Sequence, residues 1–206
     1  MTFRPHLAAG PATEPDLPPG QHLVTELPAE DSEPAPVVPT RDWTFTLTTE
    51  NGEQRQWDWA AITAMPVENC CVDLHSELGW SVMATNWQGV PMRDIFTGVT
   101  TSAEFARTST YTAYTTTLPV DDLLEMPTWV AIGLEGGPIP AEHGGPARLL
   151  VPHLYLYKSA KWVRAISLVD DVQLDSRQSD GLHHYGDPWR EQRFRESEPA
   201  TERRSR

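Results

Sequence analysis

Residues 142–166 read EHGGPARLLVPHLYLYKSAKWVRAI, and this stretch carries the most informative charge pattern in the chain. The wider segment 143–169 has no acidic residue, although the 206-residue chain has a formal net charge of -13. Its basic residues are Arg148, Lys158, Lys161 and Arg164. Glycines at 144 and 145 let main-chain N–H groups approach a ligand, and Arg and Lys bind phosphate oxygens. The segment predicts a site for an anionic, phosphorylated ligand. From charge alone, a basic face that pairs with acidic segments has equal weight.

Aromatic residues are interleaved with these basic side chains. Tyr155, Tyr157 and Trp162 all fall inside the same stretch. Such rings usually build a hydrophobic core, and the alternative is that they stack on the flat heterocycle of a ligand. Tyr155 and Tyr157 are therefore predicted either to fill the core or to line a ligand pocket.

Upstream, the sequence DLHSE at 73–77 contains the residue types of a hydrolase triad without its geometry. Successive residues of a strand point to opposite faces, so Asp73 and His75 would share one face and Ser76 would take the other. The sequence has no G-x-S-x-G motif, so no nucleophilic serine is predicted. The two histidines at 183–184 lack the i, i+4 spacing of a helical zinc site, and no zinc motif is predicted.

Composition excludes several classes of protein. The only cysteines, Cys70 and Cys71, are adjacent, and consecutive residues rarely reach disulfide geometry, so no disulfide scaffold is expected. The net negative charge makes nucleic acid and anionic membrane surfaces poor partners. No run of about 18 apolar residues occurs, which predicts no membrane insertion. The first residues lack the basic start and apolar stretch of a secretion signal, so a cytoplasmic location is predicted.

Short strands and short helices alternate along the central part of the chain. Trp43, Phe45 and Leu47 alternate with polar residues ahead of Asn51-Gly52, which predicts a β-hairpin. Further strands are predicted at 70–75, 128–134 and 161–169, with a turn at 135–138. Short helices are predicted at 57–65, after Gly89-Val90-Pro91 and at 120–126. This mixture predicts an α+β fold with mixed β-sheets.

The two ends of the chain differ from this central part. Residues 1–41 are rich in proline and in small or acidic residues, which predicts an extended arm. Within the arm, Gln21-His22-Leu23-Val24 either docks on the domain or belongs to a disordered leader. Residues 42–194 are predicted to form one domain. The polar stretch that begins at Arg193 predicts a solvated end of the chain, with a flexible charged tail over 195–206.

Four blocks of the sequence resemble the sulfite-oxidase-like molybdopterin-dependent oxidoreductases, in particular their small single-domain members with an oxidoreductase molybdopterin-binding domain. The blocks are DLHSELGWSVMATNWQGVPMRDIF at 73–96, YTTTLPVDDLL at 114–124, the opening stretch at 142–166 and HYGDPWREQRF at 184–194. The leader LPPGQ at 17–21 is similar to theirs as well. The blocks stand in the family's order. The resemblance implies the sulfite-oxidase-type molybdopterin-binding fold and a molybdenum-molybdopterin cofactor.

The resemblance also assigns residues to the cofactor. In the family, the phosphate and the ring of the pterin are held by residues that match His143, Arg148 and the stretch Ser159-Ala160-Lys161. A threonine upstream of a proline-containing helix also contributes, and the pair Thr115-Thr116 matches it here. The family carries an asparagine where this chain has Thr117, whose shorter side chain lacks the amide.

The largest departure from the family is Ser76, which stands where the family has a cysteine that ligates molybdenum. A serine hydroxyl is harder to deprotonate than a thiol and offers a hard oxygen in place of a soft sulfur. A strand advances about 3.3 Å per residue, which puts Cys71 roughly 16 Å and Cys70 roughly 20 Å from Ser76. Neither cysteine can therefore replace the ligand. The stretch Glu77-Leu78-Gly79 also brings an acid where the small members carry a Val-Thr-basic run.

Two functions follow from the resemblance. In the first, Ser76 ligates molybdenum in an oxidoreductase that performs two-electron oxygen-atom transfer on a small anionic or sulfur-containing substrate. Ser76, Tyr155 and Tyr157 are then the catalytic candidates. A separate electron-transfer partner is needed because the chain has no haem or flavin motif.

In the second, the chain is a catalytically impaired relative that acts as a pterin-binding or interaction protein. A plain acidic α+β protein with a structural basic segment is the remaining reading. A deliberate Cys-to-Ser change would leave the same residue at position 76.

Overall fold

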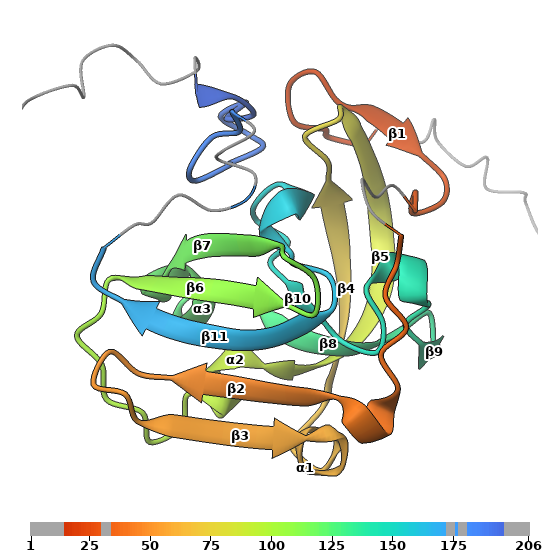
Figure 1. Cartoon of the computed structure of the whole chain (residues 1–206). Helices are drawn as coiled ribbons and strands as arrows, with labels where there is room; N and C mark the ends of the chain where they lie inside the picture. The colour runs from red at the N-terminus through yellow and green to blue at the C-terminus, as the bar shows by residue number, and fades with distance from the viewer. Residues whose placement is uncertain (1–14, 30–33, 172–175, 177–180, 196–206) are drawn as a thin grey trace, which may run out of the picture.

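Two β-sheets and a few short helices make up the fold (Figure 1). The structure is a computed structural model, and it describes residues 15–29, 34–171, 176 and 181–195. In the six-stranded sheet, β1 (His22–Val24), β5 (Trp80–Pro91), β8 (Trp129–Leu134) and β10 (Arg148–Leu150) lie in that order, while β4 (Glu68–His75) also pairs with β5 and β9 (Gly137–Pro138) with β8. The five-stranded sheet has the order β3 (Gln54–Asp58), β2 (Thr44–Thr48), β11 (Val163–Val169), β6 (Phe105–Thr110) and β7 (Thr115–Pro119).

The helices between these strands are short. They are α1 (Trp59–Thr63), α2 (Met92–Ile95) and α3 (Val120–Leu124), with 3-10 turns η1 (Thr40–Asp42), η2 (Ala141–His143) and η3 (Leu156–Lys158). Both sheets are mixed, because β1 pairs in parallel with β5 and β11 in parallel with β2, while the other pairs are antiparallel. The predicted α+β fold is confirmed. No helix in the described part of the chain is long and apolar enough to cross a membrane.

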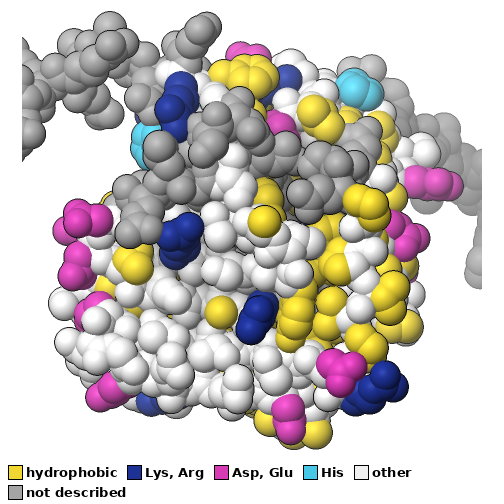
Figure 2. All heavy atoms as spheres, viewed as in Figure 1, with side chains coloured by type: hydrophobic (Ala, Val, Ile, Leu, Met, Phe, Trp, Pro, Cys, Tyr) yellow, Lys and Arg dark blue, Asp and Glu magenta, His cyan; other side chains and the backbone are white. Residues whose placement is uncertain are grey.

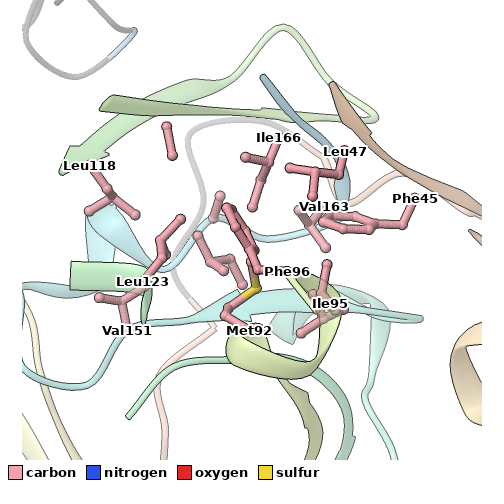
Figure 3. Close-up of a cluster of buried hydrophobic side chains, with 14 of the residues drawn as sticks. Phe45, Leu47, Met92, Ile95, Phe96, Leu118, Leu123, Val151, Val163 and Ile166 are labelled. Carbon is pink, nitrogen blue, oxygen red and sulfur yellow. The ribbon is translucent and has the colours of Figure 1, made fainter. Parts of the chain in front are cut away.

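The main hydrophobic core lies between the five-stranded sheet and the helices α2 and α3 (Figure 3). The predicted alternation in β2 supplies part of it, because Phe45 and Leu47 are buried and the threonines that alternate with them along the strand are half-buried. Met92 and Ile95 of α2 are also fully buried. Truncation of such a side chain to alanine typically costs about 2–5 kcal/mol.

A second, smaller core lies on the other face of the six-stranded sheet. Leu149 belongs to the main core and its neighbour Leu150 to the second, as expected when successive residues of a strand point to opposite faces. Other members of the second core are Leu74, Trp80, Val82, Trp87, Trp129, Ala131 and Ile139. The strand β10, which carries the predicted cofactor residue Arg148, is therefore buried on both faces.

The helix predicted at 57–65 is shorter than the sequence pattern indicated. The pattern gives only α1, because Trp57 and Asp58 pair with β2 and Asp58 caps the helix by accepting from Ala61 N at 2.7 Å. Sheet pairing prevails over the helical spacing here. The helix predicted after Gly89-Val90-Pro91 begins at Met92, because β5 continues to Pro91 and this proline caps the helix.

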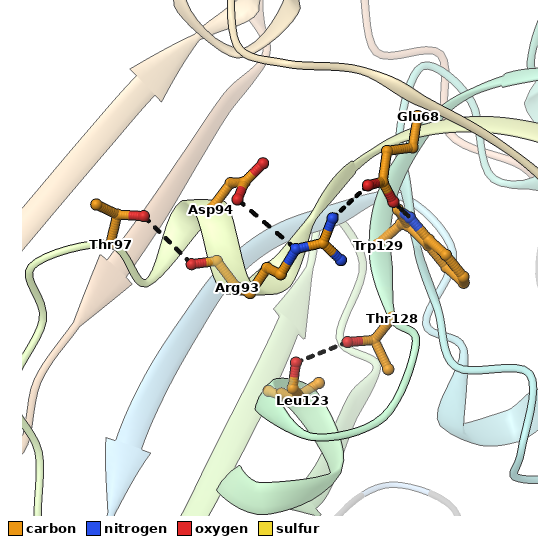
Figure 4. Close-up of polar contacts among 7 residues, drawn as sticks. All are labelled: Glu68, Arg93, Asp94, Thr97, Leu123, Thr128 and Trp129. Atoms are coloured by element: carbon orange, nitrogen blue, oxygen red, sulfur yellow. Dashed lines mark hydrogen bonds and ion pairs between the residues drawn. The ribbon is translucent and has the colours of Figure 1, made fainter.

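Polar contacts join β4, α2 and β8 (Figure 4). Arg93 of α2 forms an ion pair with Glu68 at the start of β4, and Trp129 Nε1 donates to the same carboxylate at 3.0 Å. The Trp129 hydrogen bond, together with Arg93, holds the pKa of Glu68 below its ordinary value. Nearby, the Thr128 hydroxyl donates to Leu123 O at 2.8 Å. These contacts fix the end of the β4–β5 hairpin that lies away from Ser76.

Both ends of the described chain lie against the domain. The stretch 21–24 docks, because β1 pairs with the first residues of β5. The start of the predicted solvated end is also bound, since Arg193 O accepts from His183 N and Arg195 N donates to Gly181 O. Residues 1–14 and 30–33 of the predicted arm and residues 196–206 of the predicted tail lie outside the described residues.

Candidate functional site

Arg148 lies at the start of β10 and is only 2% exposed. Its guanidinium donates to His143 O at 3.0 Å and to Ser159 O at 2.6 Å. It also lies 5.6 Å from the ring centre of Trp87 on β5. Arg148 therefore joins two of the stretches that the sequence assigned to the cofactor, those of His143 and Ser159, and it does so from inside the protein.

Lys158, at the end of η3, is fully buried. Its ammonium donates to Thr117 O on β7 at 2.9 Å and lies 5.4 Å from the ring centre of Tyr157. Sequence reasoning counted Lys158 among the basic residues but did not include it among the site residues. Its position between Tyr157 and Ser159 was the available signal.

Gly144 brings Lys161 and Arg148 close together. Its backbone is left-handed, with φ of 100°, and a Cβ there would lie 2.9 Å from Lys161 Cβ and 3.1 Å from Arg148 Cβ. Lys161 Nζ donates to Glu142 O at 2.6 Å. Only glycine adopts this conformation at low cost and leaves room for both side chains. Gly144 thus determines how close Arg148 and Lys161, two residues predicted to bind phosphate, lie to each other.

Ser159 and Ala160, also predicted to bind the cofactor, are buried as well. Ser159 Oγ accepts from Val151 N at 2.9 Å, and Ala160 O accepts from Leu149 N at 2.9 Å. We call Arg148, Lys158 and Lys161, with His143, Gly144 and Ser159-Ala160, the basic cluster. Arg164 does not belong to it, because it is exposed on β11 and lies over the ring of Tyr111 at 5.7 Å.

The basic cluster is not a solvated basic face. Arg148 and Lys158 are buried, and Lys and Arg side chains on the face seen in Figure 2 lie apart from one another. Burial of a charge is costly unless hydrogen bonds and opposite charge compensate it. The alternative of a surface that pairs with acidic segments therefore does not describe Arg148 and Lys158.

The two predicted threonines lie on β7, next to Lys158. Thr115 N donates to Ser176 Oγ at 2.9 Å, and Thr115 is half-buried. Thr116 is fully buried opposite Thr108 of β6, and neither hydroxyl has a hydrogen-bond partner among the described residues. Neighbouring strand residues face opposite ways, so Thr115 and Thr116 cannot present their side chains to the same ligand group.

Tyr155 and Tyr157 form a small buried cluster with Leu182 of the C-terminal segment. Their rings are stacked with centres 6.4 Å apart. Tyr157 OH donates to His183 O at 2.6 Å, and Tyr155 OH accepts from Arg193 Nε at 3.1 Å. Both hydroxyls thus bind the C-terminal segment, which agrees with the core-packing alternative for these rings.

Ser76 occupies the tight turn that joins β4 to β5. Its N–H donates to Trp80 O at 2.8 Å, and its carbonyl accepts from Gly79 N at 3.1 Å. Its hydroxyl accepts from Leu78 N at 3.1 Å and lies 3.5 Å from Glu77 Oε2. Ser76 is 3% exposed. The N–H of Leu78 would favour an alkoxide at Ser76, whereas the carboxylate of Glu77 would disfavour one.

The predicted alternation through residues 73–76 is interrupted. The register of β4 against β5 shifts between Val72 and Leu74, and both Leu74 and His75 are buried. His75 Nδ1 lies 2.8 Å from Ser81 Oγ, and its ring meets that of Trp189 edge-on. Burial lowers the pKa of His75 and outweighs the opposite effect of Asp73.

The strand register keeps the cysteines away from Ser76. Cys70 lies opposite Trp87 and Cys71 opposite Asn86, whereas Ser76 bonds to Trp80. Both cysteines are free. Among the described residues, no three His, Cys, Asp or Glu side chains gather in an arrangement that could hold a metal ion. A metal at Ser76 would therefore need its other ligands from a cofactor.

The Ser76 turn and the basic cluster belong to the same sheet. Trp80, which follows the turn, and Trp87, over which Arg148 lies, are both members of the second core. Figure 1 shows the β4–β5 hairpin rising beyond the five-stranded sheet, with β1 along its upper end. The arrangement offers buried cations for an anionic cofactor and, at the tip of the hairpin, a hydroxyl at the predicted metal-ligand position.

Comparison with known proteins gives a consistent result. A family model described as "Oxidoreductase molybdopterin binding domain" matches residues 32–176. The uncharacterized oxidoreductase YuiH of Bacillus subtilis is 32% identical over 181 residues, which cover 86% of this chain and 91% of that protein.

More distant similarities extend over less of the relatives. MsrP of Xanthomonas campestris, named a protein-methionine-sulfoxide reductase catalytic subunit, is 32% identical over 117 residues, or 46% of this chain and 34% of that protein. The protein of the same name in Burkholderia mallei is 26% identical over 162 residues, or 70% and 49%. The chain therefore spans a third to a half of these two relatives.

Among solved structures, the sulfane dehydrogenase SoxCD of Paracoccus pantotrophus superposes with a TM-score of 0.62 at 14% identity. The match covers 71% of this chain and 42% of that chain, and at this identity it shows the fold alone.

Proposed function

We propose a function from one premise: this chain belongs to the oxidoreductase molybdopterin-binding domain family. The proposed function is a molybdenum-molybdopterin-dependent oxidoreductase that acts on a small sulfur-containing or oxyanion substrate. The observation that carries it is the basic cluster, in which two buried cations, Arg148 and Lys158, lie within the segment that matches the family's cofactor ligands.

The residues of the basic cluster fit the phosphate and the ring of a pterin. Arg148 and Lys158 donate to main-chain carbonyls, and a phosphate nearby would add charge-assisted contacts. The absence of a side chain at Gly144 lets Lys161 and Arg148 lie close together. We assign phosphate contacts to Arg148 and Lys161, main-chain contacts to Ser159-Ala160 and a ring contact to His143.

Lys158 and Thr115 complete the assignment. Lys158 holds β7 against η3 through Thr117 O, which keeps Thr115 near the basic cluster. Thr116 points to the other face of β7, so of the two threonines we assign the side-chain contact to Thr115. Tyr155 and Tyr157 fix the C-terminal segment through their hydroxyls, and we give them a role in the shape of the site.

When bound, the cofactor supplies two-electron oxygen-atom transfer at its metal. Ser76 stands at the ligand position, and its hydroxyl is held by Leu78 N–H. A buried positive environment stabilises an anionic substrate and the charge that develops on it. The relatives named protein-methionine-sulfoxide reductase support a sulfoxide as the substrate class.

The electrons must come from another protein, since the chain carries no haem or flavin motif. The MsrP relatives are named catalytic subunits, which supports a partner of this kind. A cytoplasmic location remains a prediction from the sequence.

A second function is favoured by Glu77. Its carboxylate lies 3.5 Å from the Ser76 hydroxyl and opposes loss of the hydroxyl proton. In this case the protein keeps the pterin but holds the metal weakly, and it acts as a pterin-binding or interaction protein.

Molybdenum analysis combined with pterin extraction distinguishes these functions. The protein is purified from a host that makes the cofactor, and molybdenum and released pterin are quantified per chain. Stoichiometric amounts of both support the oxidoreductase, and pterin without molybdenum supports the second function. Absence of both contradicts the assignment of the basic cluster.

A further inference from the structure

The turn that carries Ser76 is held by one side chain of the N-terminal arm, Gln21. Its Nε2 donates to Ser76 O at 2.9 Å, and its Oε1 accepts from the Ser81 hydroxyl at 3.1 Å. The next residue, His22, donates its N–H to Gly79 O at 2.9 Å. Gln21 therefore spans the turn from its first residue to the strand that follows it.

The arm presents Gln21 in a fixed position. Gln21 N donates to Pro18 O at 3.2 Å, which closes a turn with Gly20 at φ of 67°. Arg193 donates to Pro19 O at 3.0 Å and to Gly20 O at 2.9 Å, so the C-terminal segment holds this turn in place. These contacts hold the main chain of Gln21 in place beside the Ser76 turn.

The hydrogen-bond chain has a direction that the atom types determine. Ser76 O can only accept, so the NH2 group of Gln21 faces it and the amide oxygen faces Ser81. The single O–H of Ser81 is used by that oxygen, and the contact between His75 and Ser81 must then be donated by His75 Nδ1–H. The series of hydrogen bonds, each donated to the next group, runs from His75 through Ser81 and Gln21 to Ser76 O.

We propose that Gln21 is a positioning residue for the metal-ligand position: it fixes the main chain of Ser76 and, through Ser81, keeps the proton of His75 on Nδ1. The purpose of this contact rests on the proposed function, because residues around a metal ligand set its orientation. Neither the family model, which begins at residue 32, nor the functional assignment above includes the arm residue.

The position of the Ser76 turn is tested in protein without cofactor, with a cysteine at position 76 as the probe. Ser76→Cys is combined with Cys70→Ala and Cys71→Ser, and the alkylation rate of the thiol at position 76 is measured in the folded protein. Gln21→Glu removes the donor to Ser76 O and keeps an acceptor for Ser81, so the rate should rise about tenfold, the equivalent of one lost hydrogen bond. Gln21→Leu should raise it at least as much.

The matched control is His22→Ala, which changes an exposed neighbour and keeps its main-chain bond to Gly79. Its alkylation rate should stay within twofold of the parent. Equal rates in the parent, Gln21→Glu and Gln21→Leu would overturn the proposal, and so would an equal rise in the control.

The donor-to-acceptor direction of these hydrogen bonds is tested in the unaltered protein by 15N NMR of its histidines. His75 should carry its proton on Nδ1, and Gln21→Glu should keep that tautomer because Ser81 retains an acceptor. Gln21→Leu should remove this restraint on His75, which should then populate both tautomers. A proton on Nε2 in the unaltered protein contradicts the proposal even if the variants do not fold. These results do not depend on molybdenum, so the positioning role and the proposed function can fail separately.

Discussion

The basic cluster and the Ser76 turn differ in how the fold holds them. Arg148 and Lys158 are buried between the sheets, where main-chain carbonyls of η2, β7 and the stretch around Ser159 fix their charges. Ser76 lies at the tip of a hairpin, where an arm and a C-terminal segment from far along the chain hold the main chain in place. The first site is part of the core, whereas the second is assembled from the periphery.

This difference has a chemical consequence. A change in the basic cluster would leave buried polar groups without partners, which is costly, so its residue types are tightly constrained. A change from thiol to hydroxyl at the hairpin tip alters one atom and leaves the packing as it is. The fold can therefore keep the pterin side intact while the metal side varies.

The largest expected effect is that of Arg148→Met. The carbonyls of His143 and Ser159 lose their buried donor, and unfolding free energy should fall by about 2–4 kcal/mol, with loss of bound pterin. Denaturant unfolding measures the first change and pterin extraction the second. Arg164→Met is the control, because Arg164 is exposed, and it should change stability by less than about 1 kcal/mol. Equal effects in the two variants would remove the distinction between buried and peripheral cations.

A smaller effect is expected for Lys158→Met. The methionine has a similar length and needs no solvation, so the loss of the bond to Thr117 O should lower stability by about 1–2 kcal/mol. Pterin content should fall as well. Lys161→Met should lower stability by less than about 0.5 kcal/mol, since its ammonium lies in an exposed contact with Glu142 O. A larger loss for Lys161→Met than for Lys158→Met would contradict the burial argument.

The smallest effect concerns pH. Burial, with help from Glu68 and Cys71, raises the pKa of Cys70 from 9.0 to about 11. The folded protein keeps this thiol protonated where the unfolded chain releases the proton, so its contribution is complete below pH 9 and is lost as pH rises toward 11. Thermal unfolding of the wild type should show this loss, and Cys70→Ala should lack it. A parallel pH dependence in both proteins would exclude Cys70 as its source.

Much of the fold could be predicted from local patterns. Alternation at Trp43, Phe45 and Leu47 predicted the first hairpin, and Gly89-Val90-Pro91 and the stretch 120–126 placed α2 and α3 within a few residues. The long strand β5 was missed, because Trp80–Pro91 is buried at most positions and shows no clear alternation. Pairing with β4, β8 and β1 creates it, and such pairing is not visible in a single segment.

The site was predictable where charge or a motif marked it. Arg148 and Lys161 stood out in a segment without acids, whereas the burial of Lys158 depends on a carbonyl of β7 that is 41 positions away. The contact of Gln21 with Ser76 spans 55 positions and depends on how the arm folds back. Prediction of such long-range contacts requires the tertiary structure, because the sequence around one partner does not indicate which residue the other is.

The molybdenum-to-pterin ratio of the wild type and of Ser76→Cys, purified in parallel from a host that makes the cofactor, tests the difference between the two sites most directly. A thiolate is the softer and more readily formed ligand, so the ratio in Ser76→Cys should be near one and not below that of the wild type, while pterin per chain stays the same. That result would show a complete pterin site beside a metal position that residue 76 occupies. Absence of pterin from both proteins, or loss of pterin in Ser76→Cys, would contradict it.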